Sequence, residues 1–287
     1  MDFDALRAHQ HGSFSVWQLR HGGWTRSRIR HATADLREVH HGVHVTGDAP
    51  LTELQLCWAA VLTEPGTFLS HTSVARLLGF DDWRTDVHTV TRLGSGGTRR
   101  HPGLLVYRSK TLPPAVRTHI NGLPCLSPAR TLLDLLPARS DLSARRLARN
   151  ALRVGAVDAR SLRVALALHP GRRGITRLRQ YTNEYAHLPM HRTKSDAESL
   201  GLAVLDAAQI PIPLVNVKVD GEEADYVWLA ARWIVELDSR QWHHPVEDAR
   251  KTAVWERAGW TVRRVPTDDV YDRPHRLLAA TPPLSVR

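Results

Sequence analysis

Two carboxylates interrupt a hydrophobic segment near the C-terminal end of the sequence. The segment is WIVELDSRQWHH, in which Glu236 and Asp238 alternate with large apolar side chains. A carboxylate in a hydrophobic strand is costly if it stays ionised without a partner. Because side chains alternate between the two faces of a strand, we expect Trp233, Val235 and Leu237 on the core face and both acids on the other. The acids therefore need a partner from elsewhere in the chain.

The hairpin that precedes this strand places a third acid beside them. If Ala230 and Ala231 form a two-residue turn, Asp225 lies directly opposite Glu236. Opposed side chains of an antiparallel pair share a face, with their Cβ atoms about 4.5 to 5.5 Å apart. A slip of the register by one residue would instead put Asp225 on the other face.

Carboxylates gathered on one face repel one another unless a cation neutralises them. Oxygen ligands of this kind suit Mg²⁺ or Mn²⁺ better than Zn²⁺. Such a cation lowers the pKa of a bound water and bridges a phosphate oxygen. We therefore predict a Mg²⁺ (or Mn²⁺) site formed by Asp225, Glu236 and Asp238, at which a metal-bound water hydrolyses a phosphodiester.

Each of these acids, and the further candidates Glu198 and His243, also has a simpler explanation. Glu198 follows Ser195 in SDAE, a capping box in which the glutamate bonds back to the serine N–H. Asp225 could be a charge at a strand end, Asp238 could cap the loop DSRQ, and His243 could be a surface residue. Glu236 is the hardest of the set to explain in this way.

The overall charge points to an anionic partner. The 287 residues contain 39 Lys and Arg against 29 Asp and Glu, a formal net charge of +10. Such an excess favours nucleic acid or an anionic membrane face. No apolar run is long enough for a membrane span, so we predict DNA as the partner and no membrane association.

Composition also bears on the compartment. The first ten residues, MDFDALRAHQ, carry early acids and no apolar stretch, so we expect no signal peptide. Cys57 and Cys125 lie far apart and form no CxxC pair, which argues against a disulfide framework or a zinc ribbon. The prediction is a cytoplasmic protein.

Residues 1–50 are predicted to form a winged helix-turn-helix. SFSVWQLRHGG reads as a helix capped by Ser15, WTRSRIRHATAD as a second helix, and LREVHHGVHV as a hairpin. In this layout the second helix enters the major groove and would present arginines to bases and phosphates. The alternative is an ordinary solvated face. The cationic residues of this helix are Arg26, Arg28 and Arg30, and the hairpin histidines, predicted to be surface residues, are His40, His41 and His44.

Three further regions follow. Residues 51–140 are predicted to be a mixed α/β domain, with a helix in SPARTLLDLL that begins at Ser127 and Pro128. Residues 141–192 are predicted to be a helical connector. Residues 193–287 show the order helix, three-strand meander, helix, strand, with a hairpin turn at Asp220 and Gly221. The fold class is α/β (α+β).

The last region resembles the PD-(D/E)xK nucleases. The strings IPIPLVNVKVDGEEADYVW, IVELDSRQWH and AGWTVRRV are similar to Vsr-like (very-short-patch-repair-like) endonuclease domains over roughly residues 193–280. The resemblance implies a mixed sheet flanked by helices, like that of restriction endonucleases, and an endonuclease activity.

The same resemblance implies residue roles. Asp225 and Glu236 match the metal-binding acids, Glu198 the helix acid and His243 the histidine after the third strand. The polar positions of the next helix are matched by Asp248 and Arg250. Asp238 stands where the wider superfamily has a lysine, so Lys251 or Arg250 becomes the candidate for the activating cation. Arg250 and Lys251 are also predicted to contact DNA.

The first half resembles another family. SVWQLRHGGWTRSRIR, HHGVHV, SHTSVARLLGF and LPCLSPARTLLDLL are similar to AbiEi-type antitoxins of type IV toxin–antitoxin systems. This resemblance implies a winged-helix repressor with a toxin partner or a homo-oligomeric state. The two interpretations are a metal-dependent endodeoxyribonuclease that binds DNA, or a non-enzymatic antitoxin-like repressor whose nuclease fold is degenerate.

Overall fold

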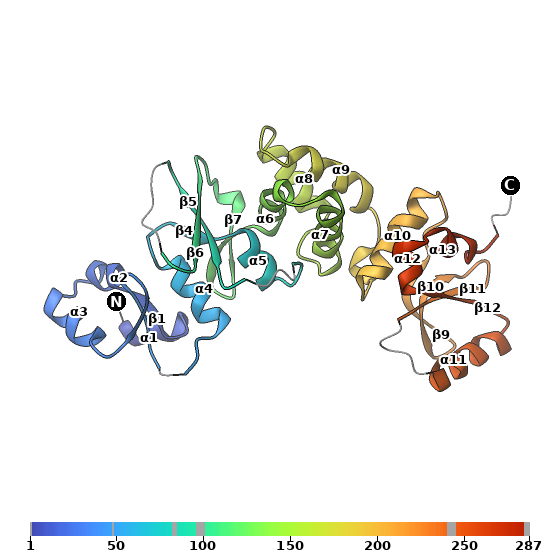
Figure 1. The fold of residues 1–287 in the computed structure, drawn as a ribbon, viewed down its shortest axis with the longest axis horizontal. Helices are drawn as coiled ribbons and strands as arrows, with labels where there is room; N and C mark the ends of the chain where they lie inside the picture. The colour runs from blue at the N-terminus through green and yellow to red at the C-terminus, as the bar shows by residue number, and fades with distance from the viewer. Residues whose placement is uncertain (1, 48, 82–84, 96–100, 240–244, 284–287) are drawn as a thin grey trace. The chain divides into compact units, whose positions relative to one another are not determined.

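The computed structural model describes residues 2–47, 49–81, 85–95, 101–239 and 245–283 (Figure 1). The chain forms two compact units, Met1–Ala138 with Arg172–Gly174, and Arg139–Gly171 with Ile175–Arg287. The described residues contain three sheets, each combined with helices. The predicted α+β class is therefore confirmed.

The first unit begins with a small three-stranded sheet and three helices. The sheet has the order β1-β3-β2, and all its pairings are antiparallel. The predicted sequence of helix, glycine-containing turn, helix and hairpin is present, although the first helix and first strand were not predicted. The elements are α1 (Phe3–His9), β1 (Ser13–Ser15), α2 (Val16–His21), α3 (Arg26–Thr33), β2 (Arg37–His40) and β3 (Val43–Val45).

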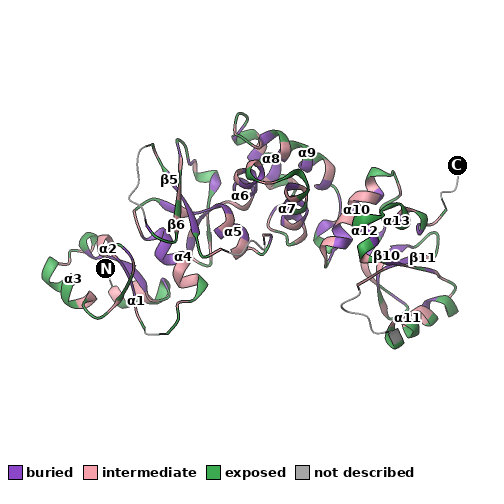
Figure 2. Cartoon of the chain, viewed as in Figure 1, coloured by how far each residue is buried: buried purple, intermediate pink, exposed green. Residues whose placement is uncertain are grey.

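Local signals position α2 and α3. Ser15 caps α2 as predicted, in a capping box with Gln18, and Thr25 caps α3 by accepting the N–H of Arg28. Ile29 is the one buried residue of α3 and packs against Phe14 and Leu19. The helix is thus held on the small core by a single side chain, and Figure 2 shows most of its surface exposed.

The prediction for the hairpin histidines is wrong at two of three positions. His40 is 8% exposed and His44 is 9% exposed, whereas His41 is exposed. His44 stacks on Phe14 with ring centroids 5.9 Å apart, and His40 meets His101 edge to face at 5.6 Å. Both are buried because the hairpin packs against the rest of the unit, which short-range spacing does not reveal.

A mixed five-stranded sheet fills the rest of this unit, in the order β6-β5-β4-β8-β7. Helix α4 joins it to the N-terminal sheet, because Trp58 shares a hydrophobic cluster with Val43 of β3, Leu69 of β4 and Val90 of β5. The elements are α4 (Glu53–Val61), β4 (Thr67–Leu69), α5 (His71–Leu77), β5 (His88–Leu93), β6 (Leu104–Ser109), the 3-10 helix η1 (Pro114–Val116), β7 (Arg117–Ile120), β8 (Leu123–Leu126), α6 (Pro128–Leu135) and the 3-10 helix η2 (Leu136–Ala138).

The second unit combines helices with a four-stranded sheet of order β12-β11-β10-β9. The strands β9, β10 and β11 form an antiparallel meander, and β12 returns parallel to β11 after the helix α11. The elements are α7 (Asp141–Arg153), α8 (Ala159–Leu168), α9 (Ile175–Tyr185), the 3-10 helix η3 (Met190–Arg192), α10 (Asp196–Ala207), β9 (Leu214–Val219), β10 (Glu222–Trp228), β11 (Trp233–Asp238), α11 (Pro245–Arg257), β12 (Thr261–Pro266), α12 (Thr267–Asp272) and α13 (His275–Ala279).

Helices cover both faces of this sheet. Trp255 of α11 is fully buried against Val227 and Ile234, and the opposite face carries Trp233, whose indole N–H donates to the carbonyl of Ala280 just after α13. No helix among the described residues is long and apolar enough to cross a membrane.

Candidate functional site

The hairpin between β10 and β11 has the predicted register. Tyr226 pairs with Val235, Val227 with Ile234 and Trp228 with Trp233. The turn is closed by the N–H of Arg232, which donates to the carbonyl of Leu229. Asp225 and Glu236 come next in this register, so they are opposite neighbours as expected.

The two carboxylates lie where the regular ladder between β10 and β11 ends. Glu236 Oε1 accepts the backbone N–H of Asp225 at 2.9 Å. In return, Asp225 Oδ2 accepts the backbone N–H of Leu237 at 2.8 Å. Each acid therefore replaces a ladder hydrogen bond with a bond from its own carboxylate, which leaves Asp225 Oδ1 and Glu236 Oε2 without a hydrogen bond to another described residue.

This pair is electrostatically strained. Burial raises the pKa of Asp225 to about 8, with further contributions from the charge of Glu236 and then of Glu198 and Asp238, against the lowering effect of the Leu237 N–H. Burial also raises the pKa of Glu236, although the Asp225 N–H, Arg264 and Lys251 lower it. Burial and mutual repulsion therefore make the ionisation of both acids together unfavourable.

Glu198 is buried and serves the start of α10. Its Oε1 accepts the hydroxyl of Ser195 at 2.8 Å, and Ser195 accepts the N–H of Glu198. Glu198 accepts the backbone N–H of Lys194 at 2.9 Å. A full capping box would instead require it to accept the N–H of Ser195. The amide of Asn216 on β9 donates to its second oxygen. The carboxylate is therefore saturated by structural hydrogen bonds.

Asp238 is held by an arginine that sequence reasoning missed. Arg264 on β12 lies opposite Glu236 in the parallel register and forms ion pairs with Asp238 at 3.0 Å and Asp248 at 3.3 Å. It also donates to the hydroxyl of Thr252. A cation is therefore present near the position where the wider superfamily has its lysine, but it comes from β12.

Three other residues of this region were predicted to take part: Arg250, Lys251 and His243. Arg250 forms an ion pair with Glu222 at 2.8 Å. Lys251 is close enough to lower the pKa of Glu236. His243 lies outside the described residues, so its predicted role stays a prediction.

The acids do not form a ready-made site with three ligands. Within the described part of the chain, the side-chain ligand atoms of Asp225, Glu236 and Asp238 do not all come within 4.8 Å of one another. An open pocket of about 730 Å³ begins beside them, between β11, β12 and α11. Its lining residues are Asp238, Asp248, Ala249, Thr252, Ala253, Glu256 and Arg264.

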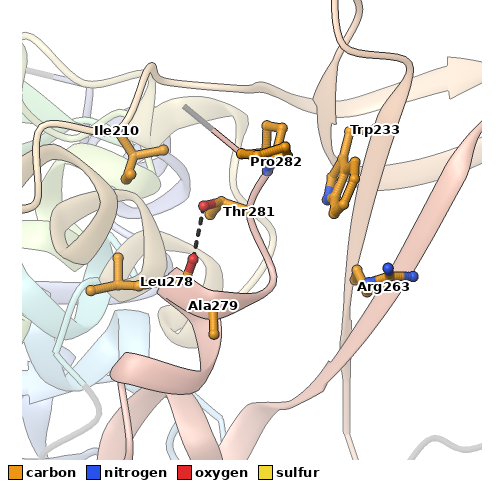
Figure 3. A pocket seen from close by; sticks show the side chains of 8 residues that line it. Ile210, Trp233, Arg263, Leu278, Ala279, Thr281 and Pro282 are labelled. Atoms are coloured by element: carbon orange, nitrogen blue, oxygen red, sulfur yellow. Dashed lines mark hydrogen bonds between the residues drawn. The ribbon is translucent and has the colours of Figure 1, made fainter. Parts of the chain in front are cut away.

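A second pocket, of about 460 Å³, lies on the opposite face of the same sheet (Figure 3). Arg263 places its guanidinium 5.1 Å from the ring centre of Trp233, and Thr281 donates to the carbonyl of Leu278 at 2.8 Å. The lining contains no carboxylate. This pocket is separate from the acids and offers no ligand for a hard cation.

The predicted DNA-binding arginines lie on α3. Arg26, Arg28 and Arg30 are all exposed, and the helix carries no acid. The guanidinium of Arg28 stacks over the ring of Trp24 at 3.8 Å. Arg26 and Arg30 have no ion pair with any described residue. They share one face of the helix, one turn apart, as predicted.

Comparison with known proteins finds a family likeness for a central segment of the chain. Residues 66–183 match the family model for the AbiEi antitoxin C-terminal domain. The match includes SHTSVARLLGF and LPCLSPARTLLDLL, whereas α3 and the acid-bearing sheet lie outside it. No curated protein matches the chain. This part of the chain is therefore similar to AbiEi antitoxins, and the predicted likeness of the C-terminal part to Vsr-like nucleases has no counterpart in these findings.

Proposed function

We propose that the protein is a DNA-binding regulator of the antitoxin type that reads the major groove with α3. The observation that carries this proposal is the exposed, acid-free face of α3, on which Arg26 and Arg30 have no protein partner among the described residues. A helix in this position of a winged helix enters the major groove. The similarity of residues 66–183 to an antitoxin domain supports the regulatory role, and a toxin partner or a homo-oligomer is proposed on the same ground.

Selection from random DNA tests binding and identifies the preferred operator sequence in the same experiment. The full-length chain selects duplexes from a random pool, and binding of the selected duplex is then measured by fluorescence anisotropy. Replacing Arg26 and Arg30 together with alanine should weaken binding by about 30-fold or more, since each contact to a base is worth about 1–3 kcal/mol.

The matched control replaces Arg160 and Arg163, two exposed arginines of α8 in the other unit. This control removes the same charge and should keep the affinity within about threefold, because it changes only long-range, screened electrostatics. Equal losses in the two double variants, or no selected duplex at all, would reject α3 as the reading element.

A second candidate function is cation-dependent cleavage of DNA at Asp225 and Glu236. The specific observation in its favour is the pair of opposed carboxylates, Glu236 buried and Asp225 partly buried, each with one oxygen that has no hydrogen bond to another described residue. These free oxygens fit a hard divalent cation, whose charge would relieve the repulsion between the acids. Glu198 and Asp238 are engaged by other groups, so they fit less well as ligands.

The roles of the chain in this chemistry follow from the contacts. Asp225 and Glu236 would hold Mg²⁺ or Mn²⁺, while the N–H groups of Asp225 and Leu237 keep the carboxylates in place. Arg264 would keep Asp238 oriented and contribute positive charge near the phosphate. When bound, such a cation lowers the pKa of water and stabilises charge on a phosphate.

Incubation of the full-length protein with supercoiled plasmid and Mg²⁺ or Mn²⁺ tests the second candidate. Nicking should fall by at least about 100-fold when Asp225→Asn and Glu236→Gln are combined, because the site loses both charges. Glu223→Gln, which removes an exposed acid on the same strand, is the matched control. Absence of nicking, or equal nicking by all three proteins, would leave the regulator as the sole function.

A further inference from the structure

A second cluster of ligand-type side chains lies in the first unit, whereas the acids belong to the second. Glu53 and Cys57 are one turn apart on α4, and His88 is the first residue of β5. One ligand atom from each of the three lies within 4.8 Å of the other two. Among the described residues, this is the one such group of three.

The contacts between the three side chains leave binding capacity unused. His88 Nε2 lies 3.4 Å from Glu53 Oε1, and Cys57 Sγ lies 4.0 Å from the same oxygen. His88 is 5% exposed, and its buried Nε2 atom makes no well-directed hydrogen bond, its contact with Glu53 being a long one of 3.4 Å. A buried nitrogen without a partner is costly, because it has lost its hydrogen bonds to water. A group bound between the three side chains would explain why this nitrogen of His88 points toward Glu53 and Cys57.

The chemistry of the three donors selects the kind of group. A thiolate, an imidazole and a carboxylate together bind Zn²⁺ and related transition metals, and a thiolate is a poor ligand for Mg²⁺.

Arg76 is the competing partner in this cluster. It forms an ion pair with Glu53 and donates to the carbonyl of Thr85 at 2.7 Å. A carboxylate has two oxygens, and metal-binding carboxylates are commonly hydrogen-bonded on the second. Glu53 is about half exposed, so rotation of its carboxylate can give one oxygen to a metal and leave the other on Arg76.

We propose that Glu53, Cys57 and His88 form a Zn²⁺-binding site that links α4 to β5. Three protein ligands leave one position of the tetrahedron for water, which can reach the cluster from the exposed side of Glu53. The site stands apart from the proposed DNA-cleaving acids, and it does not depend on that function.

The position of the site connects it to the winged helix. His40, on the hairpin strand β2, is buried, and its ring meets that of His101 edge to face with ring centroids 5.6 Å apart. Helix α4 also packs on the hairpin strand β3 through the cluster that contains Val43. A metal that fixes α4 against β5 would therefore stiffen the support of the hairpin that follows the proposed DNA-binding helix α3.

Binding of Co²⁺ and Zn²⁺ to the full-length, metal-stripped protein tests the site. Co²⁺ reports ligation by a thiolate through a charge-transfer band in the near ultraviolet, and Zn²⁺ should displace it with one-to-one stoichiometry. Cys57→Ser should abolish the band, and His88→Gln or Glu53→Gln should weaken Zn²⁺ binding by at least about tenfold. Circular dichroism of each metal-free variant checks its fold, and Glu53→Gln changes only a half-exposed residue.

The chain provides its own control in its other cysteine. Cys125 is fully buried in the same unit but outside the cluster, so Cys125→Ser should keep the band and the Zn²⁺ affinity. Glu236→Gln should keep both as well, since it alters only the acids of the other unit. No charge-transfer band in the wild type, or a band lost equally in Cys125→Ser and Cys57→Ser, would overturn the proposal.

Discussion

The two candidate sites differ in how far their like charges are exposed to solvent. On α3, the arginines stand in solvent, where water and salt screen their repulsion over about 8 Å at physiological ionic strength. At the end of the β10–β11 hairpin, Glu236 is buried and Asp225 is partly buried, and the pKa values of both are raised, first by burial and, for Asp225, also by the charge of Glu236. The exposed cluster is therefore available to any polyanion, whereas the buried pair needs a proton or a specific cation.

The largest expected effect tests how α3 is held. Ile29→Asp places a charge in the small core with Phe14 and Leu19 and should cost about 3 kcal/mol or more. Hydrogen exchange should then rise throughout residues 13–45 and DNA binding should be lost, while β9–β12 keep their protection because they belong to the other unit. Ile29→Val is the control and should cost about 1 kcal/mol. Unchanged protection of α3 in the aspartate variant would contradict this account.

A smaller effect is expected from the arginine beside the buried acids. Arg264→Met leaves Asp238 and Asp248 without their shared cation and should destabilise the second unit by about 2 kcal/mol in urea unfolding. Arg263→Met removes the neighbouring arginine, which faces Trp233 on the other side of the sheet. This change should cost about 1 kcal/mol or less. Equal costs for the two variants would show that the Arg264 ion pairs do not stabilise the sheet.

The buried pair also predicts an unusual pH dependence. Because the folded pKa of Asp225 is about 8, above that of an unfolded aspartate, its stabilising proton is lost as the pH rises through about 4 to 8. In chelator, Asp225→Asn should therefore match the wild type near pH 4 and exceed it in stability by a margin that grows as the pH rises to 8. Thermal unfolding at both pH values measures this, with Glu223→Gln as the control. A variant that is less stable than the wild type at pH 8 would show that the carboxylate is satisfied when ionised.

The smallest effect distinguishes among the arginines of α3. The guanidinium of Arg28 is committed to Trp24, so Arg28→Ala should cost about 0.5–1 kcal/mol of stability through the lost cation–π contact. Its effect on DNA affinity should be less than that of Arg26→Ala or Arg30→Ala in the same anisotropy assay. A larger loss of affinity for Arg28→Ala would mean that this arginine leaves Trp24 and contacts DNA.

Much of the fold could be predicted because its signals are local. Ser15, Ser127 and Ser195 cap helices as expected, and the turn at Asp220 and Gly221 fixes the β9–β10 hairpin. The same kind of local inference placed Asp225 opposite Glu236, because only a turn of known length separates the two strands. The register of a hairpin is set by its turn.

What could not be predicted depends on contacts between distant segments. The parallel pairing of β11 with β12 brings Arg264 opposite Glu236, but a helix intervenes and its length does not set the register. The meeting of Glu53 and Cys57 with His88 and the burial of His40 depend in the same way on how α4, β5 and the hairpin pack. Residue spacing along one element cannot reveal them.

Comparison of the two sites in one binding assay tests the central claim most directly. DNA affinity of the Arg26→Ala/Arg30→Ala variant and of the Asp225→Asn/Glu236→Gln variant is measured on the same selected duplex, in chelator. We expect the first variant to lose about 30-fold or more in affinity and the second to bind like the wild type. Loss of affinity in the acid variant, with retention in the arginine variant, would contradict the account.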